Sequence, residues 1–180
     1  MSVISKKICM VGDFGVGKTS LVRRFLDRQF SDHYLSTIGV KISRKLIPVP
    51  TDQDLQLIIW DIEGKTQFQS ITPHYLEGAM GAVIVADLNR PETIEHIQSH
   101  IQLLTSVNSS TIPCLVALNK VDTITKSGQE RSVIAELEVH PQVVTVCQTS
   151  AKTGQCVDQM FESLAQRLLE HHHARTSERS

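Results

Sequence analysis

The segment Gly12–Thr19, which reads Gly-Asp-Phe-Gly-Val-Gly-Lys-Thr, constrains the fold more than any other part of the chain. It matches the pattern GxxxxGK[ST], a glycine-rich turn that joins a strand to a helix. The apolar run Ile8–Val11 precedes it, and Lys18–Gln29 follows with apolar residues at three- and four-residue spacing. The chain is therefore predicted to begin with a strand, a tight loop and a helix.

This loop has the composition of a phosphate-binding site. Gly15 and Gly17 allow the backbone to curl so that its N–H groups point inward, and the helix N-terminus adds positive partial charge. Lys18 is expected to reach the β- and γ-phosphates of a nucleotide and to act in catalysis. The Thr19 hydroxyl is expected to bind Mg²⁺. A chance glycine-rich turn is the alternative, and the motifs further along the chain make it negligible.

Short β-branched runs alternate with helical periods along the rest of the chain. They predict an α/β fold, the three-layer sandwich of P-loop NTPases, with a six-stranded mostly parallel sheet and about five helices. One antiparallel edge strand is expected in Thr37–Val49, which pairs with Leu55–Trp60 across a proline-rich turn. The other strands are expected at Gly81–Ala86, Ile112–Leu118 and Val143–Cys147, and the other helices at Pro91–Val107, Arg131–Val139 and Cys156–Glu170.

Residues 1–170 are expected to form one domain and residues 171–180 a disordered tail, because the tail lacks apolar anchors. Its histidine run, 171–173, is interpreted as a solvated helix end, since adjacent helical positions cannot share one metal ion. The net charge of −1 gives no reason to expect a nucleic-acid partner. A cytoplasmic protein is expected, because the cysteines are scattered and no secretory leader or membrane-spanning stretch is found.

Polar residues follow two later predicted strands. Asn119–Asp122 reads Asn-Lys-Val-Asp and falls at the carboxyl edge of the sheet, where open α/β folds bind ligands. The Asp122 carboxylate only accepts hydrogen bonds, so it matches the N1–H and 2-amino donors of guanine and finds no such pair on adenine. In Thr149–Lys152, the Ala151 amide is expected to meet guanine O6 and Ser150 to brace the Asp122 loop. A guanine nucleotide is thus favoured over the ATP of a small-molecule kinase.

Two further motifs lie in order between these segments. Thr37–Gly39 reads Thr-Ile-Gly, and Trp60–Gly64 reads Trp-Asp-x-x-Gly. With all motifs present, the chain resembles the Ras-like small GTPases, most closely the Rab branch, over about Lys6–Leu169.

This resemblance implies roles for residues of two switch segments, switch I (31–40) and switch II (61–76). Thr37 would bind Mg²⁺ and sense the γ-phosphate, Asp61 would hold Mg²⁺ through water, and the Gly64 amide would meet the γ-phosphate. Loss of that phosphate would release both segments.

The resemblance also implies ligands and partners. GTP or GDP with Mg²⁺ would be bound, and Trp60 fits a hydrophobic surface for effector proteins on the two switches. An exchange factor and an activating protein are expected as well. The expected nucleotide-binding residues are Asp13, Phe14, Gly15, Val16, Gly17, Lys18, Thr19, Ser20, Phe30, Tyr34, Thr37, Gly64, Asn119, Lys120, Asp122, Ser150, Ala151 and Lys152.

The chain departs from the family pattern at three places. Lys65 stands where the family has the glutamine that orients the attacking water, so slow GTP hydrolysis is expected. A charged lysine cannot accept a hydrogen bond, although it can stabilise developing phosphate charge, so Lys65 is the second catalytic candidate and Gln67 a substitute. A guanine-nucleotide scaffold with negligible hydrolysis is the alternative function.

Phe14 is the second departure, because the family has a small residue at this position of the loop. It either alters partner-assisted hydrolysis or simply packs against switch II. The third departure is the end of the sequence, Thr176–Ser180, which lacks a cysteine for prenylation, so no direct lipid anchor is expected.

Overall fold

The computed structural model describes residues 2–31, 36–48, 53–64, 66, 70–108, 111–124 and 130–177. Within these ranges six strands form one sheet in the order β2-β3-β1-β4-β5-β6. The strands are β1 (Ser2–Gly12), β2 (Val40–Ile47), β3 (Gln53–Ile62), β4 (Gly81–Asp87), β5 (Cys114–Asn119) and β6 (Val143–Gln148). The edge strand β2 pairs antiparallel with β3, and the other described pairings are parallel. The predicted mixed sheet with one antiparallel edge strand is confirmed.

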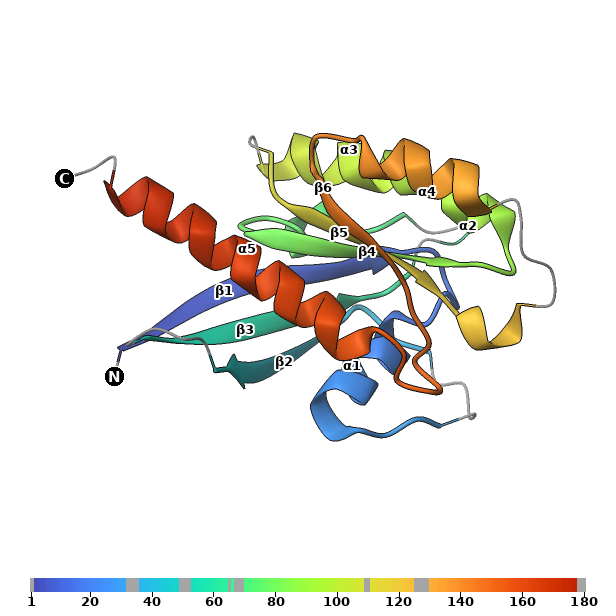
Figure 1. Cartoon of the computed structure of the whole chain (residues 1–180), viewed down its shortest axis with the longest axis horizontal. Helices are drawn as coiled ribbons and strands as arrows, with labels where there is room; N and C mark the ends of the chain where they lie inside the picture. The colour runs from blue at the N-terminus through green and yellow to red at the C-terminus, as the bar shows by residue number, and fades with distance from the viewer. Residues whose placement is uncertain are drawn as a thin grey trace.

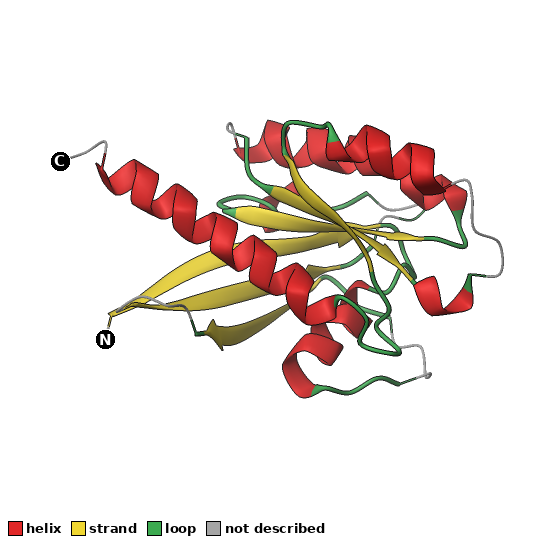
Figure 2. Cartoon of the chain, viewed as in Figure 1, coloured by secondary structure: helices red, strands yellow, loops and turns green. Residues whose placement is uncertain are grey.

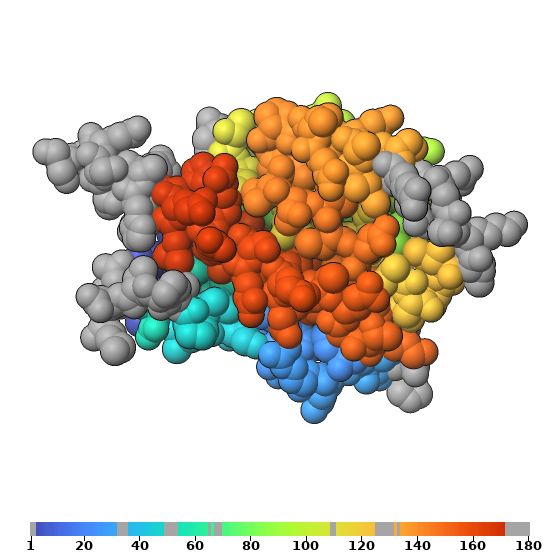
Figure 3. Space-filling model, viewed as in Figure 1, coloured from blue at the N-terminus to red at the C-terminus, as the bar shows by residue number. Residues whose placement is uncertain are grey.

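Helices cover both faces of the sheet, as Figures 1 and 2 show. On one face lie α1 (Lys18–Asp27) and α5 (Val157–Ser177); on the other lie α2 (Pro91–Glu95), α3 (Ile97–Asn108) and α4 (Glu130–Glu138). Two single 3₁₀ turns, Pro73–Tyr75 and Val121–Thr123, complete the described helical segments. In Figure 3, α5, β6 and α4 lie on the side of the molecule toward the viewer, and α1 lies beside the lower end of α5. The three-layer architecture is confirmed.

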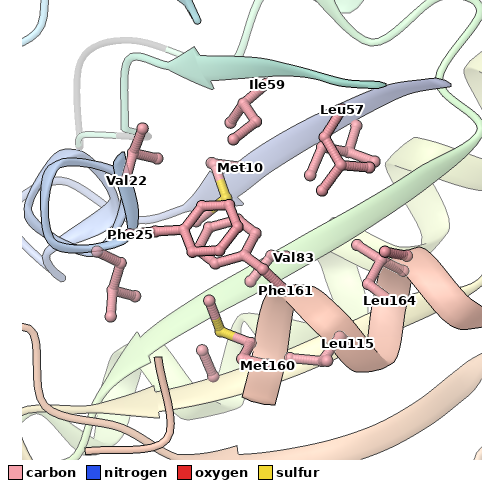
Figure 4. Packing of buried hydrophobic residues seen from close by; sticks show 14 of the residues in the cluster. Met10, Val22, Phe25, Leu57, Ile59, Val83, Leu115, Met160, Phe161 and Leu164 are labelled. Atoms are coloured by element: carbon pink, nitrogen blue, oxygen red, sulfur yellow. The ribbon is translucent and has the colours of Figure 1, made fainter. Parts of the chain in front are cut away.

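The two layers of core follow from the alternation of side chains along buried strands. In β1, Ile8 and Met10 face α1 and α5, while Cys9 and Val11 face the other helices. Phe25 and Phe161 join α1 to α5, because their rings stack with centroids 4.0 Å apart (Figure 4). The central strands are therefore buried on both sides, which anchors the loops at their carboxyl ends.

Element ends differ from the predicted ones where tertiary contacts decide them. One helix was predicted over Pro91–Val107, but the structure interrupts it at His96, whose ring contacts the phosphate loop. The last helix continues past Glu170 to Ser177, since no glycine or proline stops it there. Residues 171–177, which were expected to belong to a disordered tail, therefore lie in this helix. For residues 178–180, which lie outside the described residues, the expected disorder stays a prediction. None of the helices in the described ranges combines the length and the apolar character that a membrane-spanning helix requires.

Candidate functional site

The phosphate loop lies where β1 ends and α1 begins. Gly15 and Gly17 have φ angles of 75° and 103°, in the left-handed region that favours glycine. The Lys18 ammonium turns back over the loop and donates to the Gly12 and Asp13 carbonyls at 2.9 and 2.8 Å. Burial lowers the Lys18 pKa to about 8, although the nearby Asp61 carboxylate opposes this shift. The loop thus holds a buried cation against a ring of backbone groups.

Three oxygen-bearing side chains meet next to this loop. Thr19 Oγ1 donates to Asp61 Oδ2 at 2.6 Å and lies 2.7 Å from Thr37 Oγ1. Burial raises the Asp61 pKa, and the Thr19 hydrogen bond opposes the shift. Asp61 Oδ1 is the one buried side-chain oxygen or nitrogen in the described residues that has no hydrogen-bond partner. Such a cluster of hard oxygen ligands, with one buried acceptor still unsatisfied, fits Mg²⁺.

A cavity of about 280 Å³ opens over the loop and extends along the carboxyl edge of the sheet. It brings together most of the residues that the sequence singled out. Those that line it are Phe14, Gly15, Gly17, Lys18, Thr19, Ser20, Phe30, Thr37, Gly64, Asn119, Lys120, Asp122, Ala151 and Lys152. Sequence reasoning missed five others, Arg23, Gln29, Ser31, Ile62 and Thr123. Ile62 lies within the Trp60–Gly64 motif, and Gln29, Ser31 and Thr123 adjoin expected site residues, so proximity in sequence was the available signal for these four. Arg23 lies one helical turn after Thr19.

Other expected site residues do not line this cavity. Val16 and Ser150 are buried, and they support its walls rather than face it. Tyr34 and Lys65 lie outside the described residues, as does Gln67.

Asn119 ties the phosphate loop to the segment after β6. Its Nδ2 donates to the Val16 carbonyl at 2.9 Å, and its Oδ1 accepts from Thr149 Oγ1 and from the Ala151 amide, both at 3.3 Å. The Ala151 amide that was expected to meet guanine O6 is therefore already a weak donor to Asn119 in this structure.

Lys120 and Asp122 extend this connection. Lys120 Nζ donates to the Gly15 carbonyl at 2.9 Å and to Asp87 Oδ2 at 2.6 Å. Ser150 Oγ donates to Asp122 Oδ1 at 2.6 Å, so the two segments expected to be braced do contact each other. Asp87 was missed, although a carboxylate that ends an apolar strand at this edge was a readable signal.

Asp13 lies in the loop, but its carboxylate faces α2 and α3. His96 Nδ1 is 2.6 Å from Asp13 Oδ2, and His100 Nε2 is 3.1 Å from Asp13 Oδ1. Asp13 and His100 are both buried. The two histidines were missed in the sequence, although their four-residue spacing is typical of one helix face. The spacing did not indicate that their partner is the phosphate loop.

The two switch segments approach the loop and each other. A Cβ on Gly64 would lie 2.5 Å from the Phe14 amide nitrogen, so only glycine allows this approach. The Gly39 amide donates to Glu63 Oε2 at 2.9 Å, and the Glu63 amide donates to the Gly39 carbonyl at 2.8 Å. Phe14 is 40% exposed, and the Arg90 side chain donates to its carbonyl at 2.7 Å.

Comparison with known proteins gives a consistent result. A sequence model of the Ras family matches residues 7–170. The chain is 33% identical to the Ras-related protein Rab-13 of Rattus norvegicus over 163 residues, which cover 91% of this chain and 79% of that protein. It is 32% identical to the GTP-binding protein ypt5 of Schizosaccharomyces pombe, covering 92% of this chain and 78% of that protein.

A further relative is the Ras-related protein Rab-32 of Homo sapiens, with 31% identity over 92% of this chain and 76% of that protein. The matched residues contain the phosphate loop, both switch segments and the base-side motifs that surround the cavity. The chain therefore belongs to the Ras family, and it is a GTP-binding small GTPase that resembles the Rab branch.

Proposed function

We propose that this GTPase binds GTP or GDP together with Mg²⁺, hydrolyses GTP slowly, and presents switch I and switch II to effector proteins in the GTP state. The unsatisfied, buried Asp61 Oδ1 beside Thr19 and Thr37 carries the proposal for Mg²⁺. When bound, Mg²⁺ would neutralise charge on the β- and γ-phosphates. Lys18 would hold the same phosphates from the loop side, exchanging its two carbonyl contacts for phosphate oxygens.

The base end of the cavity supports guanine recognition. Asp122 is exposed, and Ser150 fixes one of its two carboxylate oxygens by a hydrogen bond. A carboxylate held at the mouth of the cavity accepts from the N1–H and 2-amino groups of guanine and repels an adenine edge. Phe30 lines the same cavity and supplies an apolar surface for the base or ribose.

Slow hydrolysis follows from the chemistry of position 65. Lys65 cannot both donate to and accept from a water molecule, as the family's glutamine does. The alternative is a scaffold that binds the nucleotide with negligible hydrolysis. Both functions share the same binding site and differ only in the rate of γ-phosphate release.

An apolar surface supports effector binding. Ile38 is 88% exposed and Ile42 is 47% exposed, and Trp60 is paired with Ile42 across β2 and β3. The Lys7 ammonium lies 3.7 Å from the centroid of the Trp60 ring, which fixes that ring at the surface.

All four cysteines are unpaired, which supports a reducing, cytoplasmic environment.

The experiment that tests the proposal is single-turnover hydrolysis by protein loaded with radiolabelled GTP. We expect slow phosphate release from the wild type and a faster rate from Lys65→Gln, about tenfold or more, because an amide can orient the water. GTP affinity should change little. Phe14→Gly combined with Lys65→Gln should exceed either single change if Phe14 crowds switch II.

The control is GTP loading itself, measured in every variant before the reaction starts. No detectable release from the wild type, with full loading, would support the scaffold instead. A lower rate in Lys65→Gln would mean that Lys65 stabilises the transition state directly, and Gln67 would then be tested as the residue that positions water.

A further inference from the structure

Arg24 lies outside the motifs of the guanine site, yet its side chain contacts the loop that follows β6. Its three guanidinium nitrogens all donate to backbone carbonyls. Nη1 bonds to the Arg28 carbonyl at 3.1 Å, Nε bonds to the Ala151 carbonyl at 2.7 Å, and Nη2 bonds to the Lys152 carbonyl. The first bond orients the planar fork against its own helix, and the other two hold the loop.

Holding a carbonyl also sets the direction of the N–H group in the same planar, trans peptide unit, because the two point in opposite directions. The contact with the Lys152 carbonyl therefore directs the Thr153 amide away from Arg24. That amide donates to Ser150 Oγ at 3.0 Å, and Ser150 Oγ donates to Asp122 Oδ1 at 2.6 Å. A continuous path of hydrogen bonds thus runs from Arg24 to the Asp122 carboxylate.

The middle of this path is a hydroxyl group with a single proton. When Ser150 Oγ accepts from the Thr153 amide, its proton is directed to the remaining partner, Asp122. Asp122 itself is exposed, so without this brace its carboxylate would sample several rotamers before a ligand binds. Fixing it in advance reduces the entropy lost on binding.

We propose that Arg24 is a positioning residue for guanine recognition, which fixes the Asp122 carboxylate through the 151–153 loop and Ser150. The inference rests on the proposed role of Asp122 as the acceptor for guanine. The pocket itself contains Ala151, Lys152 and Asp122 but not Arg24, so Arg24 acts through the loop and not by touching the nucleotide.

The test compares the equilibrium affinities of GDP and IDP, whose base lacks only the 2-amino group, with Mg²⁺ present. In the wild type, GDP binds more tightly because Asp122 accepts from one more donor. Arg24→Ala should lower the GDP-to-IDP affinity ratio by about three- to tenfold, the value of one well-placed hydrogen bond. Arg24→Lys should leave the ratio reduced, because a single ammonium cannot reproduce the planar fork that holds two carbonyls.

A matched control is Arg28→Asn, at the residue that directly follows the same helix. It removes one positive charge, and asparagine tolerates the left-handed backbone at this position, where φ is 59°. The Arg28 side chain pairs with Asp158 rather than with the loop, so the ratio should match the wild type. Thermal unfolding of every variant is recorded, and Arg24→Gln replaces Arg24→Ala if the latter does not fold.

A double variant tests the path itself. In a Ser150→Ala background, Arg24→Ala should lower the ratio no further, because the connection to Asp122 is already cut.

Three results would overturn the inference alone: an equal loss of GDP and IDP affinity in Arg24→Ala, full restoration by Arg24→Lys, or independent effects of Arg24 and Ser150. A ratio that does not respond to Asp122→Asn would instead overturn the guanine role of Asp122, and the inference with it.

Discussion

The contacts of Asn119 explain why asparagine occupies the first position of the Asn119–Asp122 motif. Its side-chain amide contacts the phosphate loop at Val16 and the segment after β6 at Thr149 and Ala151. A Cβ at Gly17 would lie 2.3 Å from Asn119 Nδ2, which is far closer than van der Waals contact allows. The sequence predicted both residues as parts of the site. It could not show that one of them requires the other, because they lie about a hundred positions apart.

Asp122→Asn should change the preferred base. An amide offers one acceptor and one donor group, so it cannot accept hydrogen bonds from both the N1–H and the 2-amino group of guanine. It matches xanthine instead, where an acceptor oxygen replaces the 2-amino group. GDP affinity is expected to fall by roughly 10²- to 10⁴-fold, while XDP affinity rises. Competition between the two nucleotides for the purified protein measures this.

Asp158→Asn is the control for that substitution, because it also removes one carboxylate, but one that pairs with Arg28 and does not line the cavity. It should leave the preference for GDP over XDP as in the wild type. An unchanged preference in Asp122→Asn would contradict the assignment of the base reader.

Helix ends and strand ends were the least predictable features at the scale of elements. The strand pattern Ile8–Val11 identified the centre of β1, but the strand reaches from Ser2 to Gly12. Pairing with β3, from Ser2 opposite Gln53 onward, supplies the hydrogen bonds of the polar half. Such bonds come from a partner distant in sequence, so local periodicity cannot reveal them. The centres of the elements follow from buried side chains, which periodicity does reveal.

The contact between α3 and the phosphate loop gives a prediction at this scale. His100→Ala should lower the free energy of unfolding by about 1–3 kcal/mol, because the buried Asp13 carboxylate loses one partner and a small void is left. Urea denaturation of the nucleotide-free protein measures the loss.

His74→Ala provides the comparison, since His74 pairs with Glu77 on an exposed surface. Its effect on the unfolding free energy should stay within about 0.5 kcal/mol. Equal effects of the two substitutions would mean that the Asp13–His100 contact contributes nothing to stability.

For the whole molecule, the mixed sheet and its helix layers were predicted from the alternation of strand and helix patterns, because such alternation is typical of a parallel sheet covered by helices. The order of the strands within the sheet was not predicted. The sequence indicated which residues form the two switch segments, but not where those segments lie in the fold. Their positions depend on contacts such as those between Gly39 and Glu63, which no periodic pattern encodes.

Nucleotide binding should stabilise the whole fold. With GDP and Mg²⁺ at about 100 times the dissociation constant, the gain is about 2.7 kcal/mol, or roughly 5–10 °C in Tm. Part of this stabilisation depends on Mg²⁺. In Thr19→Ala most of that Mg²⁺-dependent stabilisation should be lost, because one oxygen ligand is removed from the cluster with Asp61 and Thr37. Thermal scans with GDP, in Mg²⁺ or in EDTA, measure that part.

Ser20→Ala is the adjacent control, and it should keep the difference between the Mg²⁺ and EDTA scans. Identical differences in the wild type and in Thr19→Ala would rule out Thr19 as a ligand.

The sheet order also determines when the protein can fold during its synthesis. Strand β1 precedes β3 and β4 in the chain but pairs with both, so its two ladders cannot be complete until both of those strands have been translated. The partners of the phosphate loop that follow β4, such as His96, His100 and Asn119, are translated after that. The base-side segment at Thr149–Lys152 emerges much later, and α5 must still follow to cover the central strands. A nascent chain thus passes through a long interval in which one half of its nucleotide site exists without the other.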